Sequence, residues 1–168
     1  MDRPVLSLLQ ANLEETFHWS KSDYGWITGI FSLTYALSMI FVGRFIDRVG
    51  TRKGYAWAIG IWSLGACLHA LCGVITKHYV GVETTDELAH APSELFPVIA
   101  TVSVISFILA RVVLAIGEAG NFPAAIKATA EYFPKKDRAF ATGIFNSGSN
   151  VGAVLAPLSV PFLAQFFG

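Results

Sequence analysis

The stretch from Leu95 to Ala119 constrains the fold more than any other feature of this sequence. It reads LFPVIATVSVISFILARVVLAIGEA, and about 20 apolar residues are enough for a helix to cross a bilayer. Arg111 and Glu118 are its only charged residues. A charge at the bilayer centre costs about 2.5–3.5 kcal/mol or more, so it normally faces a protein interior or a water-filled cavity.

These two charges lie seven positions apart, which places them about 10.5 Å apart along one helix face. Opposite charges on one face of a membrane helix indicate a path for an ion, a proton or an anionic solute. The alternative is a structural ion pair that closes a helix bundle.

Composition supports an all-α membrane protein. Of the residues, 54% are hydrophobic and only 14% are charged, whereas a soluble domain carries about a quarter charged residues. The formal net charge is zero, so we expect no nucleic-acid partner. Cys67 and Cys72 match no metal or redox spacing, and the histidines do not cluster. We therefore expect no metal and no cofactor, and we interpret both cysteines as packing residues.

The rest of the sequence gives the expected positions of the helices. Ser20 lies three residues before Asp23, which is typical of a helix start. We expect a single unit over residues 1–168, in which residues 1–13 are the end of a preceding helix. Glycine, serine and alanine in the last stretch predict close helix approach there. The expected spans are roughly 22–45, 54–75, 96–120 (either ending there or continuing to 130 as a bent helix past Pro123) and 139–167.

Basic residues gather in two of the three links between these spans, and this sets the orientation. Cytoplasmic loops of membrane proteins carry an excess of lysine and arginine. The two links are therefore predicted to be cytoplasmic, and the acidic loop 76–94 to lie outside. The basic residues are Arg44, Arg48, Arg52 and Lys53 in the first link, and Lys135, Lys136 and Arg138 in the second.

The first basic link contains the sharpest local motif, GRFIDRVGTRK at residues 43–53. Gly43 would permit close helix approach, and Gly50 a tight turn between helices. Asp47 would accept hydrogen bonds from a neighbouring helix N-terminus, where partial positive charge favours a carboxylate.

This pattern resembles the loop motif between helices two and three of the major facilitator superfamily, G-x-x-x-D-R-x-G-R-[RK]. Gly43, Asp47, Arg48, Gly50 and Arg52 match it, and Thr51 departs from it. A second block, residues 111–157, resembles the anion:cation symporter family through GEAGNFPA at Gly117–Ala124. Together the two blocks most resemble bacterial hexuronate transporters of the inner membrane, which are multi-pass proteins.

The resemblance implies roles for individual residues. Proton coupling is expected at Asp2 and Glu118. Arginine offers a carboxylate a bidentate pair of donors, and amide and hydroxyl groups suit sugar hydroxyls. Tyr35 has packing as an alternative role, and the polar residues of the last span have helix–helix hydrogen bonding. The expected substrate-binding residues are Arg3, Tyr35, Arg111, Asn146, Ser149 and Asn150.

The superfamily fold has two halves of six helices, with the substrate near the midplane between them. This chain matches the region from late helix one to helix five, so we expect a partial N-terminal half whose partners are the second half, the bilayer, an organic anion and a proton. The expected function is proton-coupled hexuronate transport by alternating access. An aldonate or aromatic acid as substrate, and a non-transporting fragment, are the alternatives. No catalytic set supports an enzyme.

Overall fold

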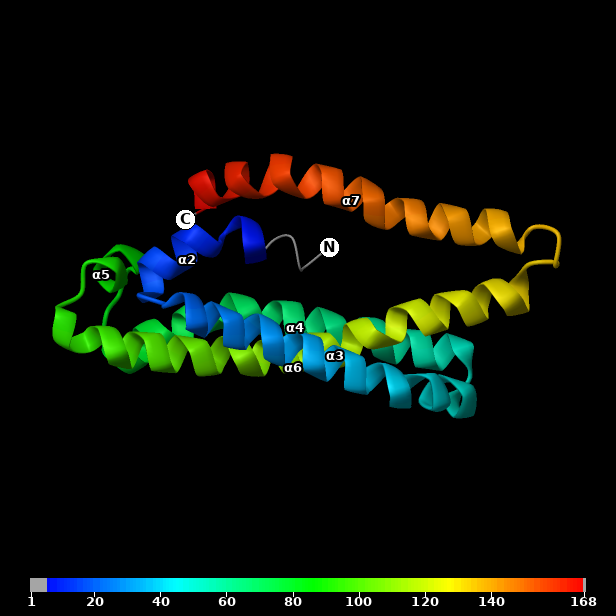
Figure 1. Ribbon diagram of the computed structural model, residues 1–168, viewed down its shortest axis with the longest axis horizontal. Coiled ribbons are helices and arrows are strands. Elements are labelled where there is room, and N and C mark those ends of the chain that lie inside the picture. The colour runs from blue at the N-terminus through cyan, green and yellow to red at the C-terminus, as the bar shows by residue number, and fades with distance from the viewer. Residues whose placement is uncertain (1–5, 168) are drawn as a thin grey trace.

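The computed structural model describes the backbone of residues 6–167 and the side chains of residues 6–162, and within these ranges it contains helices but no strand (Figure 1). Asp2 and Arg3 lie outside the described residues. The elements are α2 (Gln10–Phe17), α3 (Lys21–Val49), α4 (Thr51–Val80), α5 (Thr85–Ala89), the 3-10 turn η1 (Ser93–Leu95), α6 (Phe96–Tyr132) and α7 (Arg138–Phe167).

Local signals in the sequence set the helix ends. The Ser20 side chain accepts from the Asp23 backbone N–H and the Asp23 carboxylate accepts from the Ser20 N–H, so α3 begins with a capping box. Gly50 separates α3 from α4 with φ at 89°, a left-handed value that favours glycine. Helix α6 runs through Pro123 to Tyr132 without a break, and how much of it crosses the membrane stays a prediction.

Three of the described helices are long and apolar enough to cross a membrane: α3, α4 and the segment Ser93–Tyr132 that contains α6. They lie side by side as a bundle (Figure 1). Helix α7 occupies the fourth expected span, and its crossing of the membrane stays a prediction. Residues 1–13 were expected to be the end of a helix, and the structure extends that helix, α2, to Phe17.

Small residues bring α4 and α6 closest together. A Cβ atom added at Gly65 would lie 2.6 Å from both Cα and N of Leu114. One added at Gly117 would collide with the backbone of Trp62, and one at Gly120 would lie 2.7 Å from the Cβ of Ala58. Such contacts let van der Waals packing hold membrane helices together, because lipid supplies no hydrophobic force between them.

Two expectations about close approach are wrong. A Cβ atom at Gly43 would meet nothing within 4 Å, and the same holds for Gly143 and Gly148 in α7. The close contacts lie between α4 and α6 instead, because glycines that face a neighbouring backbone are the ones that shorten the distance between helices. Cys67 is exposed and does not pack as expected, whereas Cys72 is buried.

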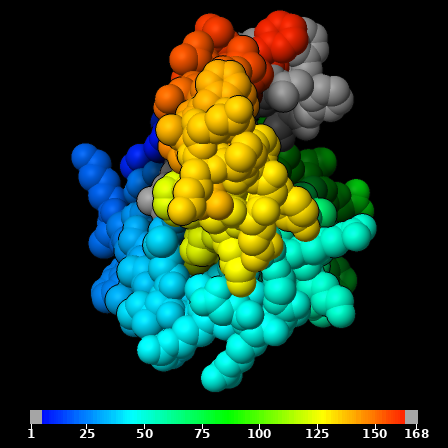
Figure 2. Space-filling view, turned by 90° about the vertical axis from the view of Figure 1, so that its right-hand side faces the viewer, coloured from blue at the N-terminus to red at the C-terminus, as the bar shows by residue number. Residues whose placement is uncertain are grey.

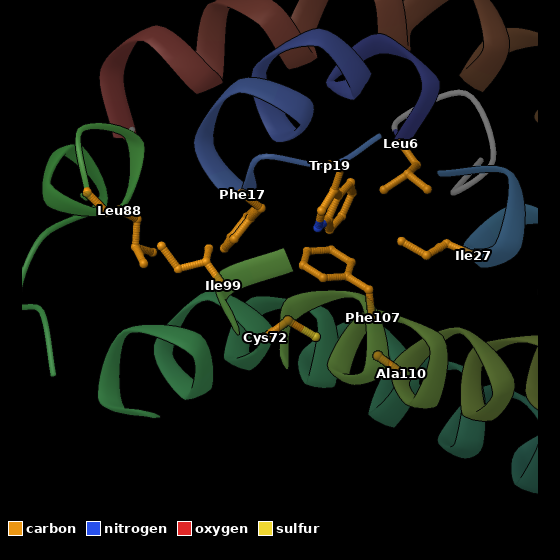
Figure 3. Packing of buried hydrophobic residues seen from close by; sticks show 10 residues of the cluster. Leu6, Phe17, Trp19, Ile27, Cys72, Leu88, Ile99, Phe107 and Ala110 are labelled. Carbon is orange, nitrogen blue, oxygen red and sulfur yellow. The ribbon is translucent and has the colours of Figure 1, made fainter. Parts of the chain in front are cut away.

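An aromatic cluster joins the chain before α3 to the bundle (Figure 3). The ring of Trp19 meets that of Phe107 edge to face at 5.0 Å, and Phe17 stacks on Trp19 at 5.5 Å. The indole N–H of Trp19 donates to the buried Ser103 hydroxyl at 2.7 Å. This cluster fixes α2 to one end of α6. His69 adds an edge contact to Phe107.

The two basic links lie at the same end of the molecule. In Figure 2 the α3–α4 link (cyan) and the α6–α7 link (yellow to orange) both face the viewer. The acidic loop around α5 lies at the opposite end in Figure 1. This arrangement agrees with the alternation of charge from which the orientation was predicted, although which end faces the cytoplasm stays a prediction.

Candidate functional site

Arg111 is the centre of the candidate site. It lies in the middle of the apolar helix α6 and is only 4% exposed. The central carbon of its guanidinium, Cζ, lies 5.1 Å from the centre of the Phe31 ring on α3. A cation at this distance from an aromatic face is attracted by the ring quadrupole, and the attraction grows where water is absent. The structure therefore sets a buried positive charge between two membrane-length helices.

Tyr35 belongs to the same region. Its ring stacks with that of Phe31, with 6.2 Å between the centroids, because residues four apart lie on one helix face. Phe31 also forms a buried cluster with Leu114 and Ala115, against which Tyr35 and Trp62 pack. The structure thus brings together two of the predicted substrate residues, Tyr35 and Arg111, through a third residue that the sequence did not single out.

Glu118 lies two turns beyond Arg111 on α6 and is half-buried. Its neighbours Gly117 and Ala119 are buried, so this part of the helix is enclosed. A carboxylate with such limited exposure, on the same helix as a buried arginine, suits a group that exchanges a proton. Its coupling role stays a prediction.

The polar residues of α7 lie apart from this cluster. Asn146, Ser149 and Asn150 are all exposed. The Ser149 hydroxyl donates to the Asn146 backbone carbonyl at 2.7 Å, a bond within α7 and not between helices. Helix α7 packs on α6 near Phe145, whose ring lies 6.4 Å from that of Phe122. A substrate role for these three residues stays a prediction.

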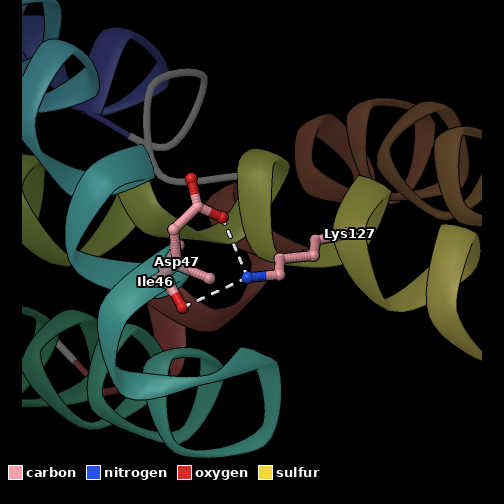
Figure 4. Close-up of polar contacts among 3 residues, drawn as sticks. All are labelled: Ile46, Asp47 and Lys127. Carbon is pink, nitrogen blue, oxygen red and sulfur yellow. Dashed lines mark hydrogen bonds and ion pairs between the residues drawn. The ribbon is translucent and has the colours of Figure 1, made fainter.

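The motif of the first basic link forms an ion pair across the bundle (Figure 4). The Lys127 ammonium of α6 donates to the Asp47 carboxylate at 2.8 Å and to the Ile46 carbonyl at 3.4 Å. The partner of Asp47 in the described structure is therefore a lysine and not the expected helix N-terminus. Lys127 was missed because the sequence left open whether α6 continues past Pro123.

The remaining motif residues occupy the turn itself. Gly50 provides the left-handed backbone between α3 and α4, and Arg48 and Arg52 are exposed on either side of it. Exposed arginines of this kind suit anionic lipid headgroups at a membrane surface.

No group of three or more histidine, cysteine, aspartate or glutamate residues in the described part of the chain is placed to hold a metal ion.

Comparison with known proteins places the chain in a family. A family model described as the Major Facilitator Superfamily matches residues 3–168. The chain is 28% identical over 157 residues to a galacturonate transporter of Dickeya chrysanthemi, covering 94% of this chain and 37% of that protein. It is 28% identical to the hexuronate transporter of Escherichia coli K12, covering 94% of this chain and 30% of that protein.

A third relative widens the range of substrates. The chain is 31% identical over 161 residues to a D-galactonate transporter of Escherichia coli O6:H1, covering 95% of this chain and 31% of that protein. The chain thus spans about a third of the length of these relatives. Their names are those of transporters and not of enzymes. No solved structure is significantly similar to the chain.

Proposed function

Because the chain belongs to the Major Facilitator Superfamily, we propose that it forms part of a transporter that moves sugar acids across a membrane. The chain is a membrane protein with three helices of spanning length in its described part. The relatives named above transport galacturonate, hexuronates and galactonate. We take a hexuronate as the substrate, a proton as the coupled ion and the bacterial inner membrane as the location.

The buried Arg111 is the observation that carries this proposal. A guanidinium inside a membrane helix is costly, so its presence there indicates a function. An anionic sugar acid that crosses the bilayer needs a cation to bind it. Arginine binds a carboxylate through two parallel N–H donors. Tyr35 adds an aromatic ring and a hydroxyl beside the same cluster, and most small-molecule sites combine apolar walls with a few such polar groups.

The mechanism is alternating access around this site. The substrate carboxylate binds Arg111 while Glu118 or Asp2 takes up a proton, and the loaded site then turns to face the other side. At one end of the bundle the Asp47–Lys127 pair holds α3 to α6. Its exposed carboxylate is available to a second partner when the halves move, which gives the motif a conformational role.

The chain works together with further protein. Sites of this kind lie at the midplane between two halves of a transporter, and the relatives are about three times as long as the matched region. The partner is therefore a second transmembrane half, packed against the face that carries Arg111 and Glu118. By itself, this chain is expected to insert into the bilayer without accumulating substrate.

The substrate is tested by uptake into vesicles. The gene is first sequenced on both sides of the region encoding residues 1–168, and the complete transporter is reconstituted. Labelled galacturonate uptake is measured with unlabelled glucuronate, galactonate, glucarate or phthalate as competitors, and with the 168-residue chain as a control. Competition by glucuronate at a lower concentration than the other three acids supports the proposal. Strongest competition by galactonate assigns an aldonate instead, which the galactonate relative favours, and no uptake refutes transport.

A further inference from the structure

We propose that Phe31 is a positioning residue for anion binding: its ring holds the guanidinium of Arg111 in the orientation that receives a substrate carboxylate. This inference rests on the proposed function, and it assigns part of the affinity of the site to a residue whose side chain has no polar atom. No polar or charged signal in the sequence marks Phe31.

The geometry of the pair supports a fixed orientation. The Arg111 Cζ atom lies 5.1 Å from the Phe31 ring centroid, and the two side chains are 4% and 3% exposed. A flexible arginine chain in such an enclosed place loses its rotamer freedom when the protein folds. That cost is met before the substrate arrives, so less ordering remains at the binding step.

The chemistry of the guanidinium explains why an aromatic neighbour suits it. The group is planar, its N–H donors lie in its plane, and its faces stack on aromatic rings. The Phe31 ring therefore stabilises the charge of the Arg111 guanidinium through its face. An aromatic ring carries no net negative charge, so it adds no repulsion toward a substrate anion that approaches the guanidinium.

The ring itself is held in place by its surroundings. Phe31 packs with Leu114 and Ala115, which follow Arg111 by three and four positions on α6 and so share its helix face. Tyr35 stacks against Phe31 from one turn along α3. Any movement of α3 relative to α6 therefore changes the distance between the ring and the cation. This dependence links the affinity of the site to the conformational cycle.

Progressive fluorination of one ring tests the proposal. Fluorine withdraws electron density from the ring face and scarcely changes its shape, so it weakens the cation–π attraction without opening a cavity. Phenylalanine at position 31 is replaced by its mono-, di- and trifluoro analogues in the complete transporter, and the Kd for galacturonate is measured. We expect a stepwise loss of affinity that reaches about tenfold with three fluorines.

A matched control uses Phe17, which is 4% exposed and contacts Trp19 and Phe107. Trifluorination there should leave the Kd for galacturonate unchanged. Unchanged or tighter binding across the Phe31 series would overturn the proposal, since tighter binding means that the ring competes with the substrate. An equal loss at Phe17 would also overturn it, because the effect would then be general.

A second measurement separates this proposal from the proposed function. The rotation of the Arg111 guanidinium about its Nε–Cζ bond is followed by NMR in the transporter without substrate. Phe31→Leu should speed this rotation several-fold, and Phe17→Leu should not. If the transporter binds no sugar acid, transport of these substrates is refuted while this rate still decides whether the ring holds Arg111. An unchanged rate in Phe31→Leu refutes the positioning role.

Discussion

Replacing Gly65 by alanine should force α4 and α6 apart. The new methyl carbon would lie 2.6 Å from both Cα and N of Leu114, whereas carbon atoms in contact are normally about 3.5–4.0 Å apart. Both atoms belong to the backbone of a helix, so no side-chain rotation relieves the clash. The two helix axes must separate by about 1 Å at this level, and the separation extends to Arg111 three residues before Leu114.

The size of the effect follows from two opposing terms. Overpacking a well-packed interior costs about 1–3 kcal/mol, and a clash with backbone belongs at the upper end of that range. Alanine is about 1 kcal/mol better than glycine inside a helix. We therefore expect Gly65→Ala to lower the free energy of unfolding by about 2 kcal/mol.

The matched control is Gly60→Ala on the same helix, where an added Cβ atom meets nothing within 4 Å. This variant should be unchanged or stabilised by up to about 1 kcal/mol. Both variants are compared by dodecyl sulfate titration of the purified protein in detergent, with helix content as the signal. Equal free energies of unfolding for the two alanine variants would refute close packing of α4 against α6.

Three further outcomes are expected. A cysteine at position 86 should react with a membrane-impermeant thiol reagent added outside intact cells, and one at position 136 should not; reversed labelling of Asp86→Cys and Lys136→Cys would contradict the orientation. Asp47→Asn should lower uptake by the complete transporter while changing the free energy of unfolding by less than about 1 kcal/mol, because the Asp47 side chain is 70% exposed; unchanged uptake would reduce the motif to a topology signal. The hydrogen bond from the Glu83 backbone N–H holds the pKa of Glu87 below its ordinary value of 4.5, so this carboxylate stabilises its loop above pH 4.5 and the stabilisation is lost as pH falls through the lowered value. The protection factor of the Glu83 amide, which is its exchange rate relative to the intrinsic rate at each pH, should show this acid dependence. Glu87→Gln should abolish the pH dependence of the protection factor, and its persistence in the variant would assign it to another group.

The helices were the predictable part of this fold. Long apolar runs and the Ser20–Asp23 signal are local properties, and they place helices over each of the expected stretches. Which helices approach most closely was not predictable, because in lipid an apolar face gains nothing from one particular partner. Gly65 and Gly117 make the close contacts, while the equally small Gly43 faces open space.

The candidate site was also predictable only in part. Arg111 stood out because a charge in an apolar helix is expensive, and its burial is what that cost predicts. Phe31 carried no such signal, since phenylalanine is common in membrane helices and only the packing of α3 on α6 places it by the guanidinium. The family resemblance, confirmed by the family model, contributed what neither residue shows, the expectation of a sugar-acid substrate.

Gradient-driven uptake by Glu118→Gln tests the central claim most directly. Glutamine resembles the protonated form of the proposed coupling residue. The variant of the complete transporter should therefore exchange labelled galacturonate across vesicles at equal pH but fail to concentrate it when a pH gradient is imposed. Arg111→Lys is the companion variant and should weaken binding itself, because it keeps the charge but loses the planar pair of donors. If Glu118→Gln concentrates galacturonate as well as the wild type does, the account of coupling through α6 is contradicted.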